Sequence, residues 1–297
     1  MSIKNSFSIK DLENLTGVKA HTIRIWEKRY ELLEPMRSDT NIRNYDQKSL
    51  QKLLNIALLN ENGVKVSKIA KLTDDEIFVK VRELVVREEH PLNAVNDFKL
   101  AMLNFDRTLF DNTYNQLLAQ SSFREIFLKV FIKLLEEIGL LWISNTITPA
   151  HEHFISVLLK QKLLINIERV QGVKAKSKKT FVLFLPQNEI HDIGIIYIHF
   201  ELLLKGYESV YLGPSVPLET LLGLQEIFEE IDYVSYFTVE PNLEKVGPFL
   251  DEMSRDILSL RGEKMHVLGR NTRELSQAKL PVGVTVYNDI ISLLDKI

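Results

Sequence analysis

The pattern with the clearest chemistry is a histidine close to two acidic residues in the C-terminal half of the chain. The apolar run TFVLFLP is followed, after two residues, by Glu189, His191, Asp192 and Gly194. A neutral imidazole is a good metal ligand, and a nearby carboxylate can fix which ring nitrogen carries the proton. The alternative interpretation is an ordinary surface histidine, which is the commoner case for a lone histidine in a loop.

A second pattern lies upstream, where Trp142 is followed after nine residues by Glu152 and His153. Each of these residues also has a plain structural interpretation, Trp142 as a bundle-core aromatic and the other two as part of a solvated helix face. Because the chain has no cysteine, disulfides, thiolate zinc sites and cysteine nucleophiles are excluded. Any metal would have to be held by histidine, carboxylate or a cofactor ring.

The elements that position His191 are predicted from an alternation of short runs over residues 177–297. Runs rich in β-branched and aromatic residues alternate with helical stretches such as IGIIYIHFELLLKG and PLETLLGLQEIFEE; these runs are TFVLFLP, SVYLG, YVSYFT, MHVLG and VTVY. The alternation predicts a parallel sheet with helices on both faces, a Rossmann-like or flavodoxin-like domain. Ligands of such sheets bind at the carboxyl ends of the strands, where the His191 loop falls.

Residues 76–172 are predicted to be helical. The stretch FREIFLKVFIKLLEEIGLLW has apolar residues almost all around a helix, which is typical of the interior of a bundle. Thr148 is placed to cap a further helix that begins at Pro149 and continues through HEHFISVLLKQKLLINIERV. We therefore expect a bundle of roughly four or five helices in this part of the chain.

The first 72 residues differ from the rest in charge and in pattern. They carry 13 Lys and Arg against 8 Asp and Glu, whereas the remainder carries 24 against 32. Ser8 can cap a short helix that ends at Gly17, and a tight turn then leads into HTIRIWEKRY, with apolar residues at helical spacing. Helix, turn, helix and then a basic hairpin are typical of a winged helix-turn-helix, whose second helix enters the DNA major groove.

The stretch LTGVKAHTIRIWEKRYELLEPMRSDTNIRNYD, continued by NENGVKVSKIAKL, resembles the start of the MerR family of transcription regulators. In that family the second helix and the wing contact DNA. The resemblance implies DNA contacts for six residues of this chain, namely Arg24, Arg29, Tyr30, Arg37, Arg43 and Tyr45. The wing tip Thr40, Asn41 and Ile42 departs from the small, glycine-containing tip usual in the family, which implies altered wing geometry.

The pattern E-x-H-x-x-G at Glu189, His191 and Gly194 resembles the motif of cobalamin-binding domains. In those domains the histidine displaces the dimethylbenzimidazole tail of the cofactor and ligates cobalt from the lower face. The resemblance therefore implies that His191 is the lower axial cobalt ligand. Glycine three residues later lets the start of the helix approach the corrin ring closely.

The pattern W-x9-E-H resembles the cobalamin-dependent photoreceptor repressors of the CarH type, in which a helical bundle covers the upper face of adenosylcobalamin. The resemblance implies that Trp142 shields the adenosyl group and that Glu152 contacts it. It also implies that His153 takes the upper cobalt position once light has broken the cobalt–carbon bond.

Two positions depart from the cobalamin-binding pattern. Such domains usually carry a serine at the end of the third strand and a Gly-Gly pair at the end of the fourth, which line a slot for the nucleotide tail. The serine position falls near Phe237, with Thr238 beside it and Ser235 two residues earlier, and the Gly-Gly position falls at Gly269 and Arg270. Phenylalanine and arginine narrow such a slot, although Arg270 can also pair with the tail phosphate. The cofactor contacts implied by the resemblance are Trp142, Glu152, His153, Glu189, His191, Asp192, Gly194, Ser235, Thr238, Gly269 and Arg270.

Composition sets the outer limits. With 297 residues, 45% hydrophobic and 26% charged, the chain is long enough for two or three folded domains. No apolar run reaches the ~18 residues of a membrane span and the start lacks a signal-peptide core, so we expect a cytoplasmic protein. We predict a multidomain α and α/β chain with a winged helix-turn-helix at 1–75, a helical bundle at 76–174 and a Rossmann-like sheet at 175–297.

Three functions are weighed. The first is a repressor that binds a double-stranded DNA operator as a homo-oligomer, a dimer or tetramer, under the control of adenosylcobalamin and light. The second is a regulator of the same architecture that no longer binds cobalamin and responds to a protein or another ligand, which the altered tail slot motivates. The third is a cobalamin-dependent methyltransferase or mutase. It is set aside because no segment fits a substrate barrel of about 250 residues, and we expect no enzyme.

Overall fold

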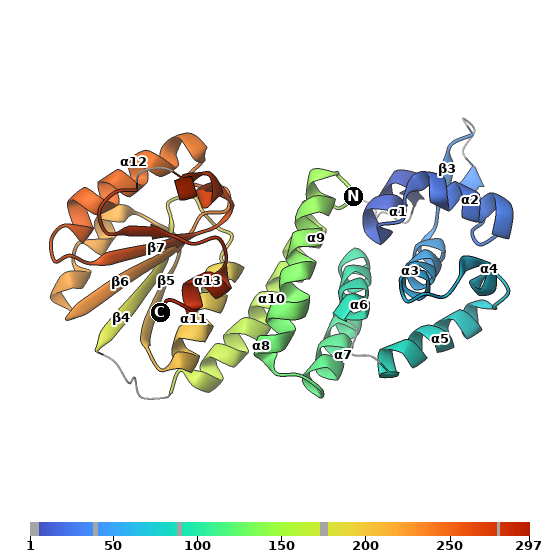
Figure 1. Ribbon diagram of the computed structural model, residues 1–297, viewed down its shortest axis with the longest axis horizontal. Helices are drawn as coiled ribbons and strands as arrows, with labels where there is room; N and C mark the ends of the chain where they lie inside the picture. Colours follow the sequence, from blue (N-terminus) through green and yellow to red (C-terminus); the bar gives the residue numbers. More distant parts are fainter. Residues whose placement is uncertain (1–5, 38–40, 88–90, 173–177, 278–279) are drawn as a thin grey trace. The chain divides into compact units, whose positions relative to one another are not determined.

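The computed structural model describes residues 6–37, 41–87, 91–172, 178–277 and 280–297 (Figure 1). It separates into two compact units, Met1–Leu158 and Leu159–Ile297. The domain boundary predicted at 75/76 stays a prediction, and so does the one at 174/175, which lies outside the described residues. In the part of the chain that is described, no helix combines the length and apolar character needed to span a membrane.

The N-terminal region is a winged helix-turn-helix, as predicted. Its elements are β1 (Phe7–Ser8), α1 (Ile9–Thr16), α2 (Ala20–Tyr30), β2 (Met36–Arg37), β3 (Arg43–Tyr45), α3 (Gln47–Glu61) and α4 (Val66–Ile69). The Ser8 hydroxyl accepts from the Asp11 amide while the Asp11 carboxylate accepts from the Ser8 amide, so α1 begins with a capping box. The helix ends at Gly17, whose φ of 75° is the left-handed conformation that glycine adopts without strain.

A small antiparallel sheet forms the wing, with strand order β1-β3-β2. Met36 pairs with Asn44 and Phe7 pairs with Tyr45. The wing is held against a core in which Ile23 and Trp26 of α2 are buried. Thr40 of the predicted wing tip lies outside the described residues.

The second region is helical, in agreement with the predicted bundle. Its elements are α5 (Asp74–Arg87), α6 (Pro91–Asn104), α7 (Arg107–Leu118), α8 (Phe123–Ile126), a π-helical segment (Phe127–Phe131), α9 (Ile132–Ile143) and α10 (Pro149–Val170). Aromatic rings fill its core, with ring centroids 4.9 Å apart between Phe98 and Phe110 and 5.6 Å apart between Phe98 and Phe131. These contacts tie α6 and α7 to the helix that carries Trp142.

The C-terminal unit is built on a parallel sheet. Its strands are β4 (Lys179–Pro186), β5 (Glu208–Val216), β6 (Glu230–Tyr236), β7 (Lys264–Leu268) and β8 (Val284–Val286). The order β5-β4-β6-β7-β8 is the flavodoxin-like order. The second strand is added on one side of the first strand, and all later strands are added on the other side. Helices α11 (Ile193–Lys205) and α13 (Ile290–Leu294) contact each other and lie on one face, and α12 (Leu243–Met253) covers the other (Figure 1). The predicted α/β class is therefore confirmed.

One predicted helix is much shorter than expected. The stretch PLETLLGLQEIFEE forms only two 3-10 turns, Leu218–Leu221 and Leu224–Glu226. Gly223 lies between them, and a glycine inside an α-helix costs about 1 kcal/mol relative to alanine. The turns bury Leu221 in the core on this side of the sheet.

Candidate functional site

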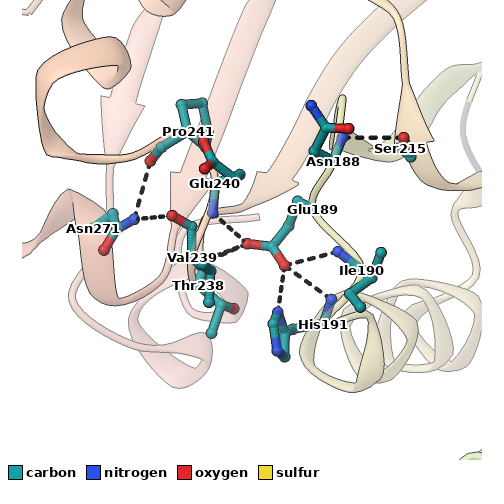
Figure 2. Close-up of polar contacts among 10 residues, drawn as sticks. All are labelled: Asn188, Glu189, Ile190, His191, Ser215, Thr238, Val239, Glu240, Pro241 and Asn271. Carbon is teal, nitrogen blue, oxygen red and sulfur yellow. Dashed lines mark hydrogen bonds and ion pairs between the residues drawn. The ribbon is translucent and has the colours of Figure 1, made fainter.

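The loop between β4 and α11 is built around the carboxylate of Glu189, which is 0% exposed (Figure 2). One oxygen accepts from the amides of Ile190 at 2.8 Å and His191 at 2.9 Å, and from Nδ1 of His191 at 2.6 Å. The other oxygen accepts three backbone amides from the loop after β6. These amides belong to Thr238 at 3.0 Å, Val239 at 2.6 Å and Glu240 at 2.9 Å.

This environment keeps Glu189 charged. Burial alone would raise its pKa, but the hydrogen bonds from His191 and from the backbone amides outweigh burial and lower the pKa to about 2. An ionised carboxylate on Nδ1 favours the tautomer with the proton on Nδ1 and the lone pair on Nε2. The His191 side chain is 49% exposed, so the loop presents an oriented imidazole at the surface.

Other contacts fix the loops on either side of Glu189 (Figure 2). The Asn188 amide donates to the Ser215 hydroxyl at 3.0 Å, which joins the β4 and β5 ends. The Asn271 side chain donates to the carbonyls of Val239 at 2.9 Å and Pro241 at 3.0 Å. Sequence reasoning missed these residues, because backbone groups and a lone asparagine leave no spacing signal.

Asp192 lies at the start of α11 and is also buried. Its carboxylate forms an ion pair with Lys160 of α10 and accepts from the Tyr211 hydroxyl of β5 at 3.3 Å. Lys160 and Tyr211 were not predicted as site residues. Together they hold α10, α11 and β5 around the residue that follows His191.

The remaining predicted residues of the sheet unit lie at and after the carboxyl end of β6, and their side chains have different surroundings. The buried Ser235 hydroxyl donates to the Phe184 carbonyl at 2.8 Å, inside the sheet. Phe237 is buried on the α12 side, with its ring centroid 5.5 Å from that of Phe249. The Phe237 side chain therefore belongs to the core on the α12 side, and the narrowing of a tail slot stays a prediction. Thr238 contributes its backbone amide to Glu189.

Tyr236, which precedes Phe237, faces α11 instead. Its ring atoms lie 3.1, 3.2 and 3.4 Å from the position that a Cβ at Gly194 would occupy. At the end of β7, a Cβ on Gly269 would lie 2.2 Å from the Phe237 carbonyl oxygen, so glycine is required by the backbone there. Arg270 is exposed at the start of a 3-10 helix, Arg270–Gln277.

The other predicted cofactor residues lie in the first compact unit. Trp142, at the end of α9, is 47% exposed. Glu152 lies in the first turn of α10 and His153 follows it. The Glu152 carboxylate is 2.7 Å from Nδ1 of His153 and also accepts from Ser156 at 2.7 Å. The preceding His151 was not predicted; it is buried, and its Nδ1 lies 2.8 Å from the Thr148 hydroxyl at the helix start.

The residues expected to contact DNA differ in how exposed their side chains are. Arg24, Arg29 and Arg37 are exposed. Tyr30 is partly buried under Arg29, whose guanidinium carbon lies 5.4 Å from the ring centroid. A hollow of about 770 Å³ between α2 and the wing is lined by basic residues and by acidic ones, including Arg24, Lys28, Arg37, Arg43, Glu27, Glu31 and Glu34.

Two of these expected DNA contacts are tied to α2. Nε of Arg43 lies 3.0 Å from the Glu27 carboxylate, and the Tyr45 hydroxyl donates to the same carboxylate. Burial and the neighbouring Glu27 raise the pKa of Tyr45 far above its usual range. Tyr45 is 0% exposed, so its side chain positions the wing and does not offer a surface to DNA, in contrast to what the resemblance implied.

Among the described residues, no group of three or more metal-binding side chains is arranged to hold a bare ion. The carboxylate–histidine pair at Glu189 and His191 fits a histidine that ligates a cofactor-borne metal, because its tautomer and orientation are fixed. The contact of Tyr236 with Gly194 does not fit a nucleotide tail placed on that side of α11.

Comparison with known families finds two matching regions in the first 165 residues. Residues 7–76 match the MerR HTH family regulatory protein family. The N-terminal region is therefore similar to the MerR family over these residues. Residues 94–165, which include Trp142, Glu152 and His153, match a family described as a B12 binding domain.

Two transcriptional repressors are similar in sequence to this chain over most of its length. The HTH-type transcriptional repressor CarH of Myxococcus xanthus is 26% identical over 80% of this chain and 80% of its own. The repressor CarA of the same organism is 24% identical over 72% of this chain and 70% of its own. Both repressors are thus similar to this chain over most of its length, which includes the regions matched by the two family models.

A solved structure is similar in fold to most of this chain. The monomethylamine corrinoid protein of Methanosarcina barkeri superposes with a TM-score of 0.58 at 14% identity, over 70% of this chain and 98% of that protein. At this identity the likeness concerns the fold alone: a helical region followed by a flavodoxin-like sheet.

Proposed function

We propose that this MerR-type chain is a transcriptional repressor controlled by cobalamin. The observation that carries the proposal is the Glu189–His191 pair, a buried ionised carboxylate 2.6 Å from Nδ1 of a half-exposed histidine at the carboxyl end of a parallel strand. Ligands of this fold bind at that edge. His191 would hold the cobalt of the cofactor through Nε2, and Asp192 and Gly194 would shape the surface beside it.

The helical region is the proposed cover of the cofactor's upper face. Bound adenosylcobalamin supplies a cobalt–carbon bond that light breaks. Trp142 offers an exposed apolar surface for the adenosyl group, and Glu152 offers a carboxylate beside it. His153 would be available to hold the cobalt once the adenosyl group has left. It is 71% exposed, and Glu152 holds its Nδ1 as Glu189 holds that of His191.

The DNA-binding function rests on the exposed arginines of α2 and the wing. Arg24, Arg29 and Arg37 can contact phosphates or bases of a double-stranded operator. One such head has a small footprint, so a homo-oligomer that presents several heads together would bind with greater avidity. We propose that adenosylcobalamin stabilises the oligomer and that light dissociates it.

The first test is an absorption spectrum of the full chain after incubation with adenosylcobalamin in the dark and removal of free cofactor. The expected result is a retained corrin spectrum that is lost or shifted in His191→Ala. His21→Ala is the matched control, because His21 is an exposed histidine of the DNA-binding head. A colourless wild-type protein would contradict the proposal.

The light response needs its own measurement. Dark, cofactor-loaded protein is expected to elute as an oligomer in size-exclusion chromatography and to dissociate after green light. His153→Ala should alter the spectrum of the illuminated state while leaving dark binding in place. An elution volume unchanged by cofactor and by light would contradict this part of the proposal and leave the cobalamin assignment standing.

A regulator of the same architecture without cobalamin is the second candidate. It is favoured by one observation, the Tyr236 ring packed directly on Gly194 beside the proposed ligand. In that case the same spectrum stays colourless for every corrinoid, and the helical region responds to a protein or another ligand.

A further inference from the structure

The Tyr236 ring packs on Gly194, in the first turn of α11. Gly194 is in the first turn of α11, three residues after His191, and lacks a side chain that would cover the helix there. The Tyr236 ring takes this place, with three ring atoms 3.1 to 3.4 Å from the Cβ position of Gly194. Tyr236 is the last residue of β6, which pairs directly with β4, so strand and helix meet at the ring.

This placement matters for the kind of corrinoid that can bind. The nucleotide tail of cobalamin is attached on the corrin face that His191 would ligate, and it is displaced from cobalt when a protein histidine takes the lower position. A displaced tail then has to lie beside that histidine. Along the first turn of α11, the space beside Gly194 is filled by the Tyr236 ring, whose nearest atom lies 3.1 Å from where a Cβ on Gly194 would be.

The surroundings hold Tyr236 in this place. Its neighbour Phe237 is buried on the opposite face of the sheet against Phe249, and the Phe237 amide donates to the Leu268 carbonyl at 2.7 Å. Gly269 crosses so close to Phe237 that a Cβ would meet its carbonyl oxygen at 2.2 Å. The backbone on both sides of the strand end is therefore fixed, and the direction of the Tyr236 side chain with it.

We infer that Tyr236 is a specificity-determining residue that favours corrinoids without a nucleotide tail. This inference rests on the proposed function, because it concerns the same site. The ring excludes the tail from the side of α11, while His191 and Glu189 still hold the corrin from below. Cobinamide, the corrinoid that lacks the tail, is the ligand class that fits this surface.

The test compares diaquocobinamide with hydroxocobalamin on the full chain, by spectral titration and equilibrium dialysis. Wild type is expected to bind cobinamide at least about tenfold more tightly, which corresponds to about 1.4 kcal/mol. Tyr236→Ser should strengthen cobalamin binding and bring the two dissociation constants within about threefold. Tyr236→Phe keeps the ring and should keep the preference, which separates the volume of the ring from its hydroxyl.

The outcomes distinguish the two proposals. Equal affinity of wild type for both corrinoids, or an unchanged ratio in Tyr236→Ser, overturns the role of Tyr236 and leaves the cobalamin proposal intact. No spectral change with either corrinoid, in wild type and in Tyr236→Ser, overturns the proposed function and this inference together. His191→Ala should lose the spectral signature of imidazole ligation with both corrinoids.

Discussion

Glu189 connects two loops through one carboxylate. It receives amides from its own loop and from residues 238–240, and it holds His191 through Nδ1. The Glu152–His153 pair repeats the carboxylate–imidazole contact on a helix, at 2.7 Å. In each pair the carboxylate sets the tautomer, and so the nitrogen that can act as a ligand.

Replacing Glu189 should lower the free energy of unfolding more than removing any other single charge in this loop. In Glu189→Gln the amide nitrogen would place donors against backbone donors inside a fully buried site. We expect the free energy of unfolding to fall by about 2 to 4 kcal/mol, measured by urea denaturation. Glu219→Gln, at an exposed carboxylate of the same unit, is the control and should change it by less than about 0.5 kcal/mol. Equal effects of the two substitutions would contradict the role given to Glu189.

His199 on α11 should make stability depend on pH. Burial lowers its pKa to about 4, and its Nδ1 lies 2.7 Å from the Ser209 hydroxyl. The unfolded chain binds a proton near the usual histidine pKa of about 6.5, so between pH 6.5 and 4 the unfolded state holds more protons and stability falls as pH falls.

The variant His199→Gln isolates this effect. Its free energy of unfolding relative to wild type should rise by on the order of 2 kcal/mol between pH 7 and pH 4. Other titrating groups are shared by both proteins and cancel in the difference. Parallel stability curves over this pH range would show that His199 titrates alike in the folded and unfolded states.

At the scale of elements, α1 of the DNA-binding head is fastened to the helical region by polar contacts. Lys99 of α6 is buried and donates to the Leu15 carbonyl of α1 at 2.9 Å and to the Glu137 carboxylate of α9 at 2.7 Å. Asn14 donates to the Thr146 hydroxyl at 3.0 Å, between α9 and α10. The helix that supports α2 thus contacts the segment that joins Trp142 to His153.

Lys99→Met tests the strength of this connection. It leaves the Leu15 carbonyl without its lysine donor, and we expect a loss of about 1 to 3 kcal/mol in the free energy of unfolding. Lys129→Met is the matched control, because Lys129 of the π-helical segment makes an exposed pair with Glu125 at 3.4 Å, with an expected loss below about 0.5 kcal/mol. Similar losses in urea denaturation for the two lysines would count against a special role for Lys99.

At the scale of the whole molecule, charge is divided unevenly along the chain. The first 72 residues have five more basic than acidic side chains, while the rest has an excess of eight acidic ones. Binding of this basic head to DNA phosphates releases counterions, so affinity should fall steeply with salt.

Salt titrations can rank the arginines of the head. Arg24→Ala and Arg37→Ala should each reduce the slope of log K against log salt for duplex DNA by about 1. Arg43→Ala should reduce it less, because Glu27 already lies 3.0 Å from its Nε. Lys178→Ala, an exposed change in the sheet unit, should leave the slope unchanged. An equal reduction for all three arginines would contradict the pairing of Arg43 with Glu27.

Much of the architecture follows from local sequence. The capping box at Ser8, the end of α1 at Gly17 and the apolar strand TFVLFLP act within a few residues, so periodicity and turn chemistry predict them. The E-x-H-x-x-G spacing likewise places Glu189 and His191 in one loop, and the hydrogen bond between them is local. Where a predicted helix was wrong, after β5, long-range packing of Leu221 outweighed helical periodicity.

Other features were decided only by tertiary structure. The three amides of residues 238–240 that bind Glu189, and Lys160 on Asp192, come from distant parts of the chain, and no local pattern encodes such contacts. Strand alternation decides that Tyr236 and not Phe237 faces Gly194, because neighbouring residues of a strand point to opposite faces of the sheet. Burial likewise removes Tyr45 from the DNA surface, since a side chain's exposure depends on what packs over it and not on its type.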